Sequence, residues 1–390
     1  MSVAGTKDTG SVVGRKYDVA NVVSLLNVGR YPLLGILTNA GKDPVTKKGK
    51  AMKKKVTTDP EFKWFEDSFG TRALTAASGT NNLDPDGGSF NITAGQGLLL
   101  SVGDLIHFPS LSWTFEVTGI STDAITVGAE LGGATGSASS VTSVEVYIVG
   151  NANEEGAGIR TLKTTTATEK TGYCQIFRTP FGITNTANNT TTFISENDLS
   201  YQRRKKGIEH MVDIERAFFF GKKAKITSGS HPKRYTMGII DTISTYATAN
   251  VDTEAEFETF LESAFAYGNT EKYAFCSATF VSQINVWAKN KLMLVDKADT
   301  YGVQIVKYVS PHGVLNIIKH ELLTGTTYGN YCVVLDLEAL SYRFLQNRDT
   351  KLLTNRQSND EDQTVEEYLS EVGLQMEQES RHAICSKGSL

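Results

Sequence analysis

The sequence contains no lysine and no arginine between Ala73 and Ile159, although the chain of 390 residues has 39 of them. Arg72 and Arg160 stand directly before and after this gap. The window holds 14 of the 35 glycines and nine carboxylates: Asp84, Asp86, Asp104, Glu116, Asp123, Glu130, Glu145, Glu154 and Glu155. A domain with its own surface normally carries charges of both signs. The absence of bases therefore predicts a separate module, residues 73–159, inserted into a chain of different composition.

Long apolar runs are missing as well. No run approaches the ~20 residues of a membrane-spanning helix, so we expect no membrane partner. The first residues lack the basic-then-apolar pattern of a signal peptide. Cysteine is scarce, and the four cysteines form no C-x-x-C pair: Cys174, Cys276, Cys332 and Cys385. Buried free thiols are the simpler interpretation than disulfides or metal ligands, which indicates synthesis in a reducing cytoplasm.

Patterns that support catalysis are also lacking. There is no phosphate-binding Walker loop, no G-x-G-x-x-G and no G-x-S-x-G. His320-Glu321 begins like a zinc-protease motif, but Thr324 stands where the second histidine belongs. The six histidines are scattered, and a structural or surface role is the simpler interpretation of each. We therefore expect no enzyme activity, no metal site and no cofactor.

The charges that are present are segregated along the chain. Residues 1–60 carry eleven lysines and arginines against four carboxylates, whereas Asp360–Glu379 carries eight carboxylates and no base. A monomeric enzyme has little need of such segregation. A building block with distinct faces could use it.

The base-free window alternates apolar and polar residues in short runs between Gly, Ser and Asn. These runs predict strands at Leu98–Val102, Asp104–Phe108, Trp113–Val117, Ala124–Val127 and Val141–Val149. Short, evenly spaced strands with glycine-rich turns are typical of a small barrel or sandwich.

Outside the window, the sequence predicts a mixture of helices and strands. The longest helix covers residues 195–221, with Ser195 as N-cap and Gly221 as a C-terminal stop. Two shorter helices are predicted at Thr253–Tyr267 and Thr279–Asn290. Strands are predicted at Lys170–Thr184, Lys272–Ser277, Val303–Val309, Val314–Lys319, Tyr331–Leu337, Thr364–Met376 and Arg381–Ser386. The predicted class is α+β with an all-β insertion. Before residue 60 we expect only a short helix near Val19–Leu26 and an apolar plug at Tyr31–Leu37.

Three charged clusters are candidate contact residues. The first is a lysine run that could meet DNA phosphates or an acidic neighbouring subunit: Lys47, Lys48, Lys50, Lys53, Lys54 and Lys55. A solvated flexible arm is an equal alternative, and no interleaved aromatic indicates base stacking. The second, on the long helix, favours a subunit-facing or solvated surface: Arg203, Arg204, Lys205 and Lys206. The third is its candidate counterpart across a subunit boundary: Asp360, Glu361 and Asp362.

An ordered set of short motifs adds a family resemblance. It begins with Tyr173-Cys-Gln-Ile-Phe-Arg and Gly182-Ile-Thr, followed by the segment Tyr201–Gly221. Upstream and downstream matches are Phe62-Lys-Trp-Phe-Glu-Asp, Val102-Gly-Asp-Leu-Ile, Phe115-Glu-Val-Thr-Gly-Ile, Asp336–Leu345 and Glu371-Val-Gly-Leu-Gln. In order and spacing, from about Pro60 onward, the chain resembles the major capsid proteins of tailed bacteriophages with the Hong Kong 97-type fold.

The resemblance implies a domain plan. Residues 1–59 would be an N-terminal arm, and residues 60–170 an extended E-loop that contains the insertion 73–159. Residues 171–234 would hold the strand and long "spine" helix of the peripheral (P) domain. Residues 235–342 would be the axial (A) domain, and residues 343–390 would return to the P domain.

The resemblance also implies a function. The protein would self-assemble into hexamers and pentamers of an icosahedral head that encloses double-stranded DNA, after synthesis in the host cytoplasm. Candidate partners are a scaffolding protein, a portal and a decoration protein. We expect the base-free module on an outer or intercapsomer surface, away from the packaged DNA.

Two other hypotheses belong to different classes. One is another virion component, such as a decoration or tail protein, which the β module alone would fit. The other is a β-rich glycan-binding protein or glycosidase with Asp104 and Glu116 as a carboxylate pair. In a window without bases, solvated carboxylates are the simpler interpretation.

Overall fold

The computed structural model describes residues 32–34, 52–79, 81–156, 158–160, 162–164, 166–190, 198–287, 292–294 and 305–388. The chain divides into two compact units. Unit 1 comprises Met1–Trp64 and Glu169–Leu390, and unit 2 comprises Phe65–Thr168. Unit 2 therefore contains the whole of the predicted insertion, with a few residues more at each end.

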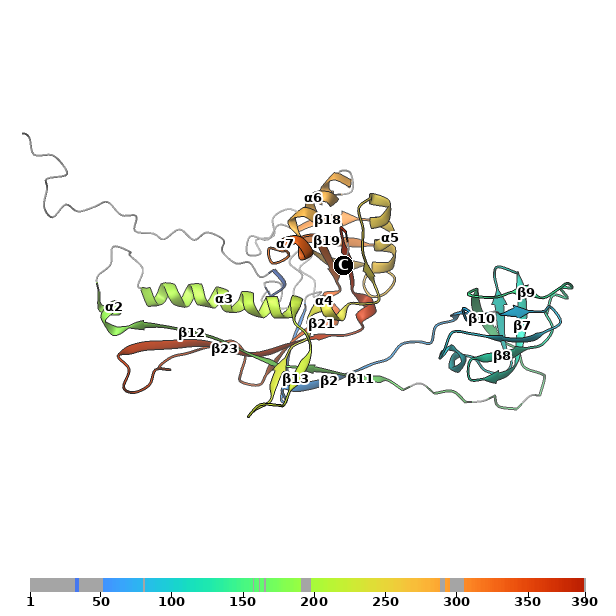
Figure 1. Ribbon diagram of the computed structural model, residues 1–390, viewed down its shortest axis with the longest axis horizontal. Coiled ribbons are helices and arrows are strands. Elements are labelled where there is room, and N and C mark those ends of the chain that lie inside the picture. The colour runs from blue at the N-terminus through green and yellow to red at the C-terminus, as the bar shows by residue number, and fades with distance from the viewer. Residues whose placement is uncertain are drawn as a thin grey trace, which may run out of the picture. The chain divides into compact units, whose positions relative to one another are not determined.

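Unit 2 is built on an antiparallel sheet of six strands (Figure 1). In spatial order these are β3 (Ala73–Thr75), β10 (Glu145–Asn151), β6 (Asp104–Phe108), β7 (Trp113–Ser121), β8 (Ala124–Val127) and β5 (Gly88–Asn91). A separate pair is formed by β4 (Asn82–Leu83) and β9 (Ser139–Ser140). Ile106, Phe108 and Phe115 are fully buried in its core, as alternation along half-buried strands predicts. The all-β insertion is confirmed.

One strand prediction in this window is wrong, and a second places the start of its strand too early. Residues 98–102 are not a strand, because the chain turns through Gly95 (φ 84°) into a 3-10 helix, η1 (Gln96–Leu99). The Asp123 carboxylate fixes this turn by accepting the backbone N–H groups of Gly95 and Gly97 at 2.9 and 3.0 Å. The strand predicted at 141–149 begins only at Glu145, since Ser143 has a left-handed backbone (φ 55°).

The first sheet of unit 1 has five strands. They run in the order β1 (Lys53–Thr57), β21 (Leu340–Leu345), β23 (Gln363–Met376) and β12 (Gln175–Thr184), and β22 (Lys351–Leu353) also pairs with β23. Helix α3 (Asp198–Phe220) runs alongside β12 and β23 (Figure 1). A two-stranded ladder joins β2 (Glu61–Glu66) to β11 (Thr168–Tyr173).

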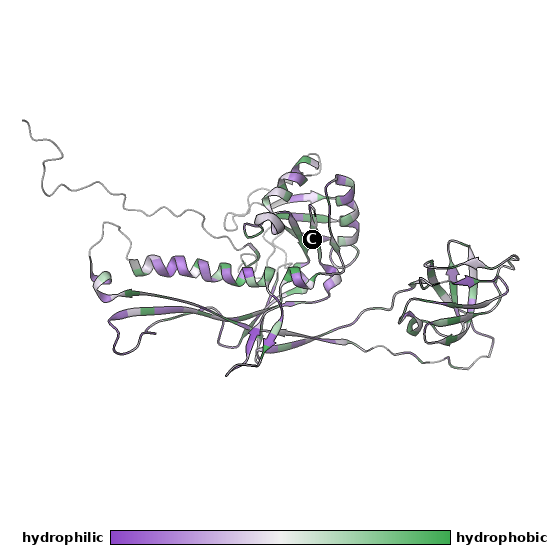
Figure 2. Ribbon diagram, viewed as in Figure 1, coloured by the Kyte–Doolittle hydropathy of each residue, from purple (hydrophilic) through white to green (hydrophobic). Residues whose placement is uncertain are grey.

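Helix α3 confirms the long helix predicted over 195–221, and its predicted N-cap Ser195 lies outside the described residues. Apolar residues gather toward its C-terminal end (Figure 2). There Phe218 and Phe219 are fully buried in the core of unit 1, among residues of β21 and β23. Burying two such rings contributes about 2–3 kcal/mol each. The helix is therefore held by packing at this end, and it stops at Gly221 as predicted.

Strand β23 confirms the strand predicted over Thr364–Met376. Gly373 lies within this strand, opposite Arg343 of β21, and packing requires glycine there. A Cβ atom at this position would lie 2.4 Å from the backbone oxygen of Tyr173 and 3.1 Å from the Phe62 ring. Only glycine permits this close approach of two backbones.

The second sheet of unit 1 has seven strands. In spatial order they are β15 (Ala247–Thr248), β24 (Ala383–Ser386), β20 (Tyr331–Leu335), β16 (Glu271–Cys276), β19 (Val314–Lys319), β18 (Ile305–Val309) and β17 (Leu292–Leu294). The helices α5 (Glu254–Ala264) and α6 (Ala278–Trp287) pack their apolar faces into its core. Each of these two helices and each strand predicted from Lys272 onward is present.

The last strand of the chain belongs to the second sheet. Residues 383–386 are predicted to lie in the segment that returns to the P domain, and in the structure β24 pairs with β15 and β20 inside the seven-stranded sheet. The reason is that Ala383, Ile384 and Cys385 are all buried and complete a hydrophobic layer that β20 shares. The chain thus enters this sheet twice, once over 247–335 and again at its last strand.

Smaller elements complete unit 1. These are α2 (Asn185–Asn189), the hairpin β13 (Ala224–Ile226) with β14 (Lys233–Tyr235), α4 (Ile239–Thr242), α7 (Gly325–Tyr328), η2 (Leu337–Ala339) and η3 (Glu379–Arg381). All four cysteines are buried and free, as expected. No helix in the described part of the chain is long and apolar enough to cross a membrane.

Candidate assembly surfaces

Strand β23 carries charged residues on both faces. Consecutive strand residues point to opposite sides, so Glu366 and Glu367 take different partners. Glu366 faces α3, where Arg203 donates two hydrogen bonds to its carboxylate at 2.5 and 2.6 Å. On the same face, His210 of α3 meets Ser370 at 2.7 Å. This face of β23 is therefore bound to the helix by polar contacts.

The opposite face of β23 pairs its glutamates with arginines from neighbouring segments. Arg178 of β12 donates two hydrogen bonds to Glu367, and Arg348 donates to Glu371 at 2.5 Å. Arg356 adds a second cation 3.7 Å from Glu367. The hydrogen bond from Arg178 holds the pKa of Glu367 below its usual range. The carboxylates are buried and the guanidinium groups are about half exposed.

These pairs change the interpretation of the acidic segment Asp360–Glu379. Glu377 is bound by Lys55 at 3.2 Å, and Glu379 accepts the backbone N–H groups of Ser244 and Thr245. Seven of its eight carboxylates accept hydrogen bonds within this chain, and four of these also have an arginine or lysine partner: Glu366, Glu367, Glu371 and Glu377.

The predicted acidic cluster lies on the surface. Asp360, Glu361 and Asp362 are all exposed, and no lysine or arginine of the described residues forms an ion pair with them. Asp362 accepts a hydrogen bond from Asn185 at 2.5 Å, and Glu361 accepts one from Gln363 at 2.6 Å. Their negative charge is not neutralised within the described part of the chain.

The predicted basic cluster on α3 is divided between roles. Arg203 is bound to Glu366 of its own chain, and Lys206 pairs with Glu209 one turn along at 2.6 Å. Arg204 lies over the Tyr201 ring, 5.7 Å from its centroid. Lys205 has no ion-pair partner among the described residues. The structure therefore does not bring the basic cluster to Asp360–Asp362 within one chain.

The lysine run is ordered where the structure describes it. Lys53, Lys54 and Lys55 lie in β1, which runs parallel to β21. Lys54 forms an ion pair with Asp349 and lies 5.0 Å from the centroid of the Phe344 ring. Lys54 and Lys55 are thus neutralised inside unit 1, and Lys53 is exposed. Lys47, Lys48 and Lys50 lie outside the described residues.

A buried carboxylate anchors the segment Pro32–Leu34. Glu215 of α3 accepts the backbone N–H groups of Leu33 and Leu34, each at 3.1 Å. The same carboxylate lies 2.8 Å from Nε2 of His320, and neither side chain is exposed. Nδ1 of His320 accepts the N–H of Leu322, so Nε2 carries the proton that it donates to Glu215. Leu33 and Leu34 are buried in the core, as the predicted apolar plug required.

Sequence reasoning missed this anchor and the arginine–glutamate pairs. The signal for the pairs was the adjacent Glu366-Glu367 on a predicted strand, since a half-buried strand can bury one carboxylate on each face only with partners. No local signal joined Glu215 to His320, which are 105 residues apart.

The carboxylate pair of the glycosidase hypothesis is not arranged for catalysis. Asp104 is engaged by Arg160 at 2.6 Å and by the backbone N–H of Ser101 at 2.6 Å. Glu116 lies on β7, one strand away, and is exposed. Both carboxylate oxygens of Asp104 are therefore already engaged by donors of this chain, Oδ1 by Arg160 and Oδ2 by Ser101. In the described part of the chain, no group of three or more His, Cys, Asp or Glu side chains could hold a metal ion.

Comparison with known proteins identifies the family. The model of the family described as SU10 major capsid protein matches residues 3–388. The curated major capsid protein of Pseudomonas phage PaMx41 is 23% identical over 227 residues, which cover 54% of this chain and 54% of that protein. The chain thus matches about half the length of this curated relative.

Two solved structures match almost the whole chain at low sequence identity. The capsid of a native GTA particle matches with a TM-score of 0.47 and 7% identity, covering 97% of each chain. A structure from Mycobacterium phage Cain matches with a TM-score of 0.47 and 9% identity, covering 98% of each chain. The family match, which extends over almost the entire sequence, confirms the predicted resemblance, and the chain belongs to the SU10 major capsid protein family.

Proposed function

We propose that this protein is the repeating subunit of a phage head: it self-assembles into hexamers and pentamers of an icosahedral shell that encloses double-stranded DNA. The observation that carries the proposal is the family match over residues 3–388. The protein would act in the virion after synthesis in the host cytoplasm, with scaffolding, portal and decoration proteins as partners. Its role is structural, and no catalytic step is assigned to it.

The architecture of unit 1 supports a capsid subunit of the Hong Kong 97 type. Helix α3 would be the spine helix, and β12 and β23 the strands that it braces. The seven-stranded sheet would be the core of the A domain. The ladder of β2 with β11 would be the base of the E-loop, with unit 2 as the insertion in it.

The charges that remain unpaired are the natural contacts between copies. Asp360, Glu361 and Asp362 are exposed acids, and Lys205 is a cation without an ion-pair partner among the described residues. Opposite charges on two faces of a repeating subunit favour correct registration and fast association. We propose that these clusters meet across subunit boundaries, whereas Arg203 and Lys206 act within one chain.

The basic N-terminal segment and the acidic unit 2 would face different surroundings. Phosphates attract positive charge without a particular geometry. Lys47, Lys48, Lys50 and Lys53 would contact the packaged DNA or an acidic neighbour. Unit 2, with eleven carboxylates and three bases, would lie on an outer or intercapsomer surface away from the genome.

The experiment that tests the proposal is assembly of the full chain, alone and together with a scaffolding protein from the same phage, followed by negative-stain electron microscopy. We expect rings and closed shells. A protein that stays monomeric at high concentration under both conditions would contradict the proposal.

A charge swap tests the proposed contact. Lys205→Glu should reduce the yield of shells about tenfold, and a compensating change of Asp360 and Asp362 to lysine should restore it, because opposite charges would again face each other. Lys222→Glu, a mostly exposed lysine near the end of α3, is the matched control and should assemble normally. Failure of the compensating change would exclude this pairing while leaving shell formation intact.

A second candidate function is that of a decoration or tail protein, which the separate β-rich unit 2 favours. Copy number distinguishes the two. Quantitative mass spectrometry of purified virions should find hundreds of copies per particle for a shell subunit, and only a few for a tail protein.

A further inference from the structure

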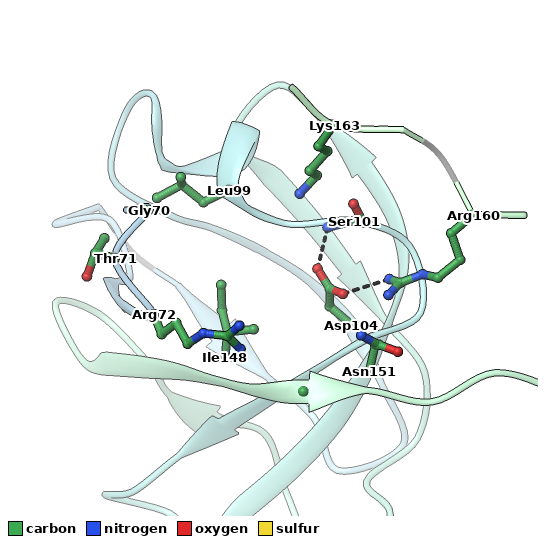
Figure 3. A pocket seen from close by; sticks show the side chains of 11 residues that line it. Gly70, Thr71, Arg72, Leu99, Ser101, Asp104, Ile148, Asn151, Arg160 and Lys163 are labelled. Carbon is green, nitrogen blue, oxygen red and sulfur yellow. Dashed lines mark hydrogen bonds and ion pairs between the residues drawn. The ribbon is translucent and has the colours of Figure 1, made fainter. Parts of the chain in front are cut away.

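All the bases of unit 2 lie around one cavity. Between Phe65 and Thr168 the sequence has three lysines and arginines, against eleven carboxylates. These three, Arg72, Arg160 and Lys163, line a single cavity of about 310 Å³ (Figure 3). The remaining lining comes from the entry segment Gly70–Thr71, from η1 and from the ends of β6 and β10. Its volume lies at the lower end of the ~300–1,000 Å³ range of small-ligand sites.

Asp104 is the carboxylate that lines the cavity together with the three cations. Arg160 donates through Nη2 to Asp104 at 2.6 Å and to the backbone oxygen of Val102 at 2.7 Å. Asp104 also accepts the N–H of Ser101 at 2.6 Å, so this carboxylate is fixed in place. Arg72 and Lys163 have no ion-pair partner among the described residues. The cavity is therefore left with two uncompensated positive charges.

The hydrogen-bonding capacity of the cavity is also incomplete. Nε of Arg160 is buried and has no acceptor in the described part of the chain. Buried donors are nearly always paired, so an orphan beside a cavity marks the position of a missing acceptor. Desolvation lowers the pKa of Lys163 and the neighbouring Arg160 lowers it further, although Asp104 opposes both. This is the behaviour of a cation that lacks a full counter-charge.

The grouping of these three cations is electrostatically unfavourable without an anion. In a unit with eleven carboxylates, three isolated bases could each pair with an acid on the surface. Placing them together instead costs mutual repulsion. An anion in the cavity would remove that cost, and guanidinium and ammonium groups offer donors that suit planar and tetrahedral oxyanions.

We propose that this cavity is an oxyanion-binding site, which takes one carboxylate or phosphate group between Arg72, Arg160 and Lys163. In an assembled particle the group is either a free inorganic anion or an acidic side chain of a neighbouring chain. Both sources present the same chemistry to the three cations.

The first experiment uses the full-length, unassembled protein and inorganic phosphate as the probe. Binding is followed by ³¹P line broadening at an ionic strength held constant with NaCl, which separates a site from general screening. We expect saturable binding. The double variant Arg72→Gln/Lys163→Gln should weaken it at least about tenfold, since both uncompensated charges are lost. Both residues are exposed, so the variant should fold, as checked by circular dichroism.

Two aspartate-to-asparagine variants provide a test with a matched control. Asp104→Asn should tighten phosphate binding several-fold, because Arg160 loses its counter-charge. Asp86→Asn makes the same change of net charge at an exposed position that does not line the cavity, and it should leave the affinity unchanged. Absence of saturable binding in the wild-type protein, or an equal effect of the two asparagine variants, would overturn the proposal.

The second experiment distinguishes the sources of the anion. Phosphate is titrated into assembled particles. Retained binding identifies a free anion as the occupant, and lost binding identifies a group from a neighbouring chain that already fills the cavity. Only this second arm depends on the proposed shell function, so failure of assembly leaves the first experiment valid.

Discussion

The two units of this protein satisfy their carboxylates with different donors. In unit 1, Glu366, Glu367 and Glu371 are bound by arginines from α3, β12 and the segment before β22. In unit 2, Asp123 accepts the N–H groups of Gly95 and Gly97, and Glu130 accepts those of Thr114 and Ala134. These carboxylates of unit 1 thus use side-chain cations, whereas these carboxylates of unit 2 use the backbone. Glu379 in unit 1 and Asp104 in unit 2 are exceptions, since Glu379 accepts backbone N–H groups and Asp104 is bound by Arg160.

The difference explains how a module almost without bases can be ordered. A carboxylate needs hydrogen-bond donors rather than a counter-ion, and two backbone N–H groups stabilise its charged form. Such donors become available where the chain turns, and unit 2 is rich in glycine turns. The hydrogen bond from Ala134 accordingly holds the pKa of Glu130 below its usual range, although no cation among the described residues is paired with it.

The strongest test of this comparison concerns Glu215, a unit 1 carboxylate that takes its donors from both sources. Glu215→Ala should lower the free energy of unfolding by about 3–5 kcal/mol, because it leaves His320 and two backbone N–H groups buried without their acceptor. Urea denaturation of the unassembled chain measures the change. The control is Glu209→Ala on the exposed side of the same helix, with an expected cost below about 0.5 kcal/mol. Equal losses of unfolding free energy in the two variants would show that the Glu215 anchor contributes nothing to stability.

Unit 1 should also be the first to respond to acid. Burial lowers the pKa of His382 to about 3, so between pH 3 and 6.5 the unfolded chain binds a proton that the folded chain does not. This contribution is therefore constant above pH 6.5 and falls below it. Lowering the pH from 7 to 5 should cost about 2 kcal/mol.

Urea denaturation at the two pH values checks this expectation. His382→Gln should abolish most of the difference, whereas His312→Gln, on the surface, should retain it. An unchanged pH dependence in His382→Gln would assign the acid sensitivity to other groups.

In unit 2, the stability of the turn before η1 should depend on the hydrogen-bond acceptor that Asp123 supplies and not on its negative charge. Asp123→Ala removes the acceptor of two N–H groups at the start of η1 and should cost about 1 kcal/mol. Asp123→Asn keeps an oxygen acceptor in the same place and should cost only a few tenths of a kcal/mol. Hydrogen exchange of the peptide that contains Gly95–Leu99 reports the local change. Equal costs for the two variants would mean that the negative charge itself is required.

The smallest expected effect is that of salt on individual carboxyl groups. Raising NaCl to about 1 M should move the pKa of Glu367 upward toward its ordinary value, because screening weakens its interaction with half-exposed arginines. The pKa of Glu130 should change less, since its donors are backbone dipoles at contact distance. Carboxyl-carbon NMR titrations at low and high salt measure both. A larger shift for Glu130 would contradict the comparison.

Local sequence patterns predicted many of the elements. Strand β6 was predicted to the residue, because alternation over Asp104–Phe108 ends at Pro109. Helix α3 was predicted from its apolar spacing and from Gly221. Where the prediction failed, as at η1, a distant side chain decided the structure, since Asp123 supplies the acceptor that turns the chain at Gly95.

The sequence by itself determined the base-free module, most of the helices and strands, and the family. These depend on residue types and on spacing along the chain, which local propensity and periodicity report directly. Only the tertiary structure decided which charges are paired. Arg203 and Glu366 are 163 residues apart, and the three bases of unit 2 meet at one cavity although Arg72 and Arg160 flank the whole module. Pairing depends on where the folded chain brings side chains together, and no pattern of neighbouring residues contains that distance.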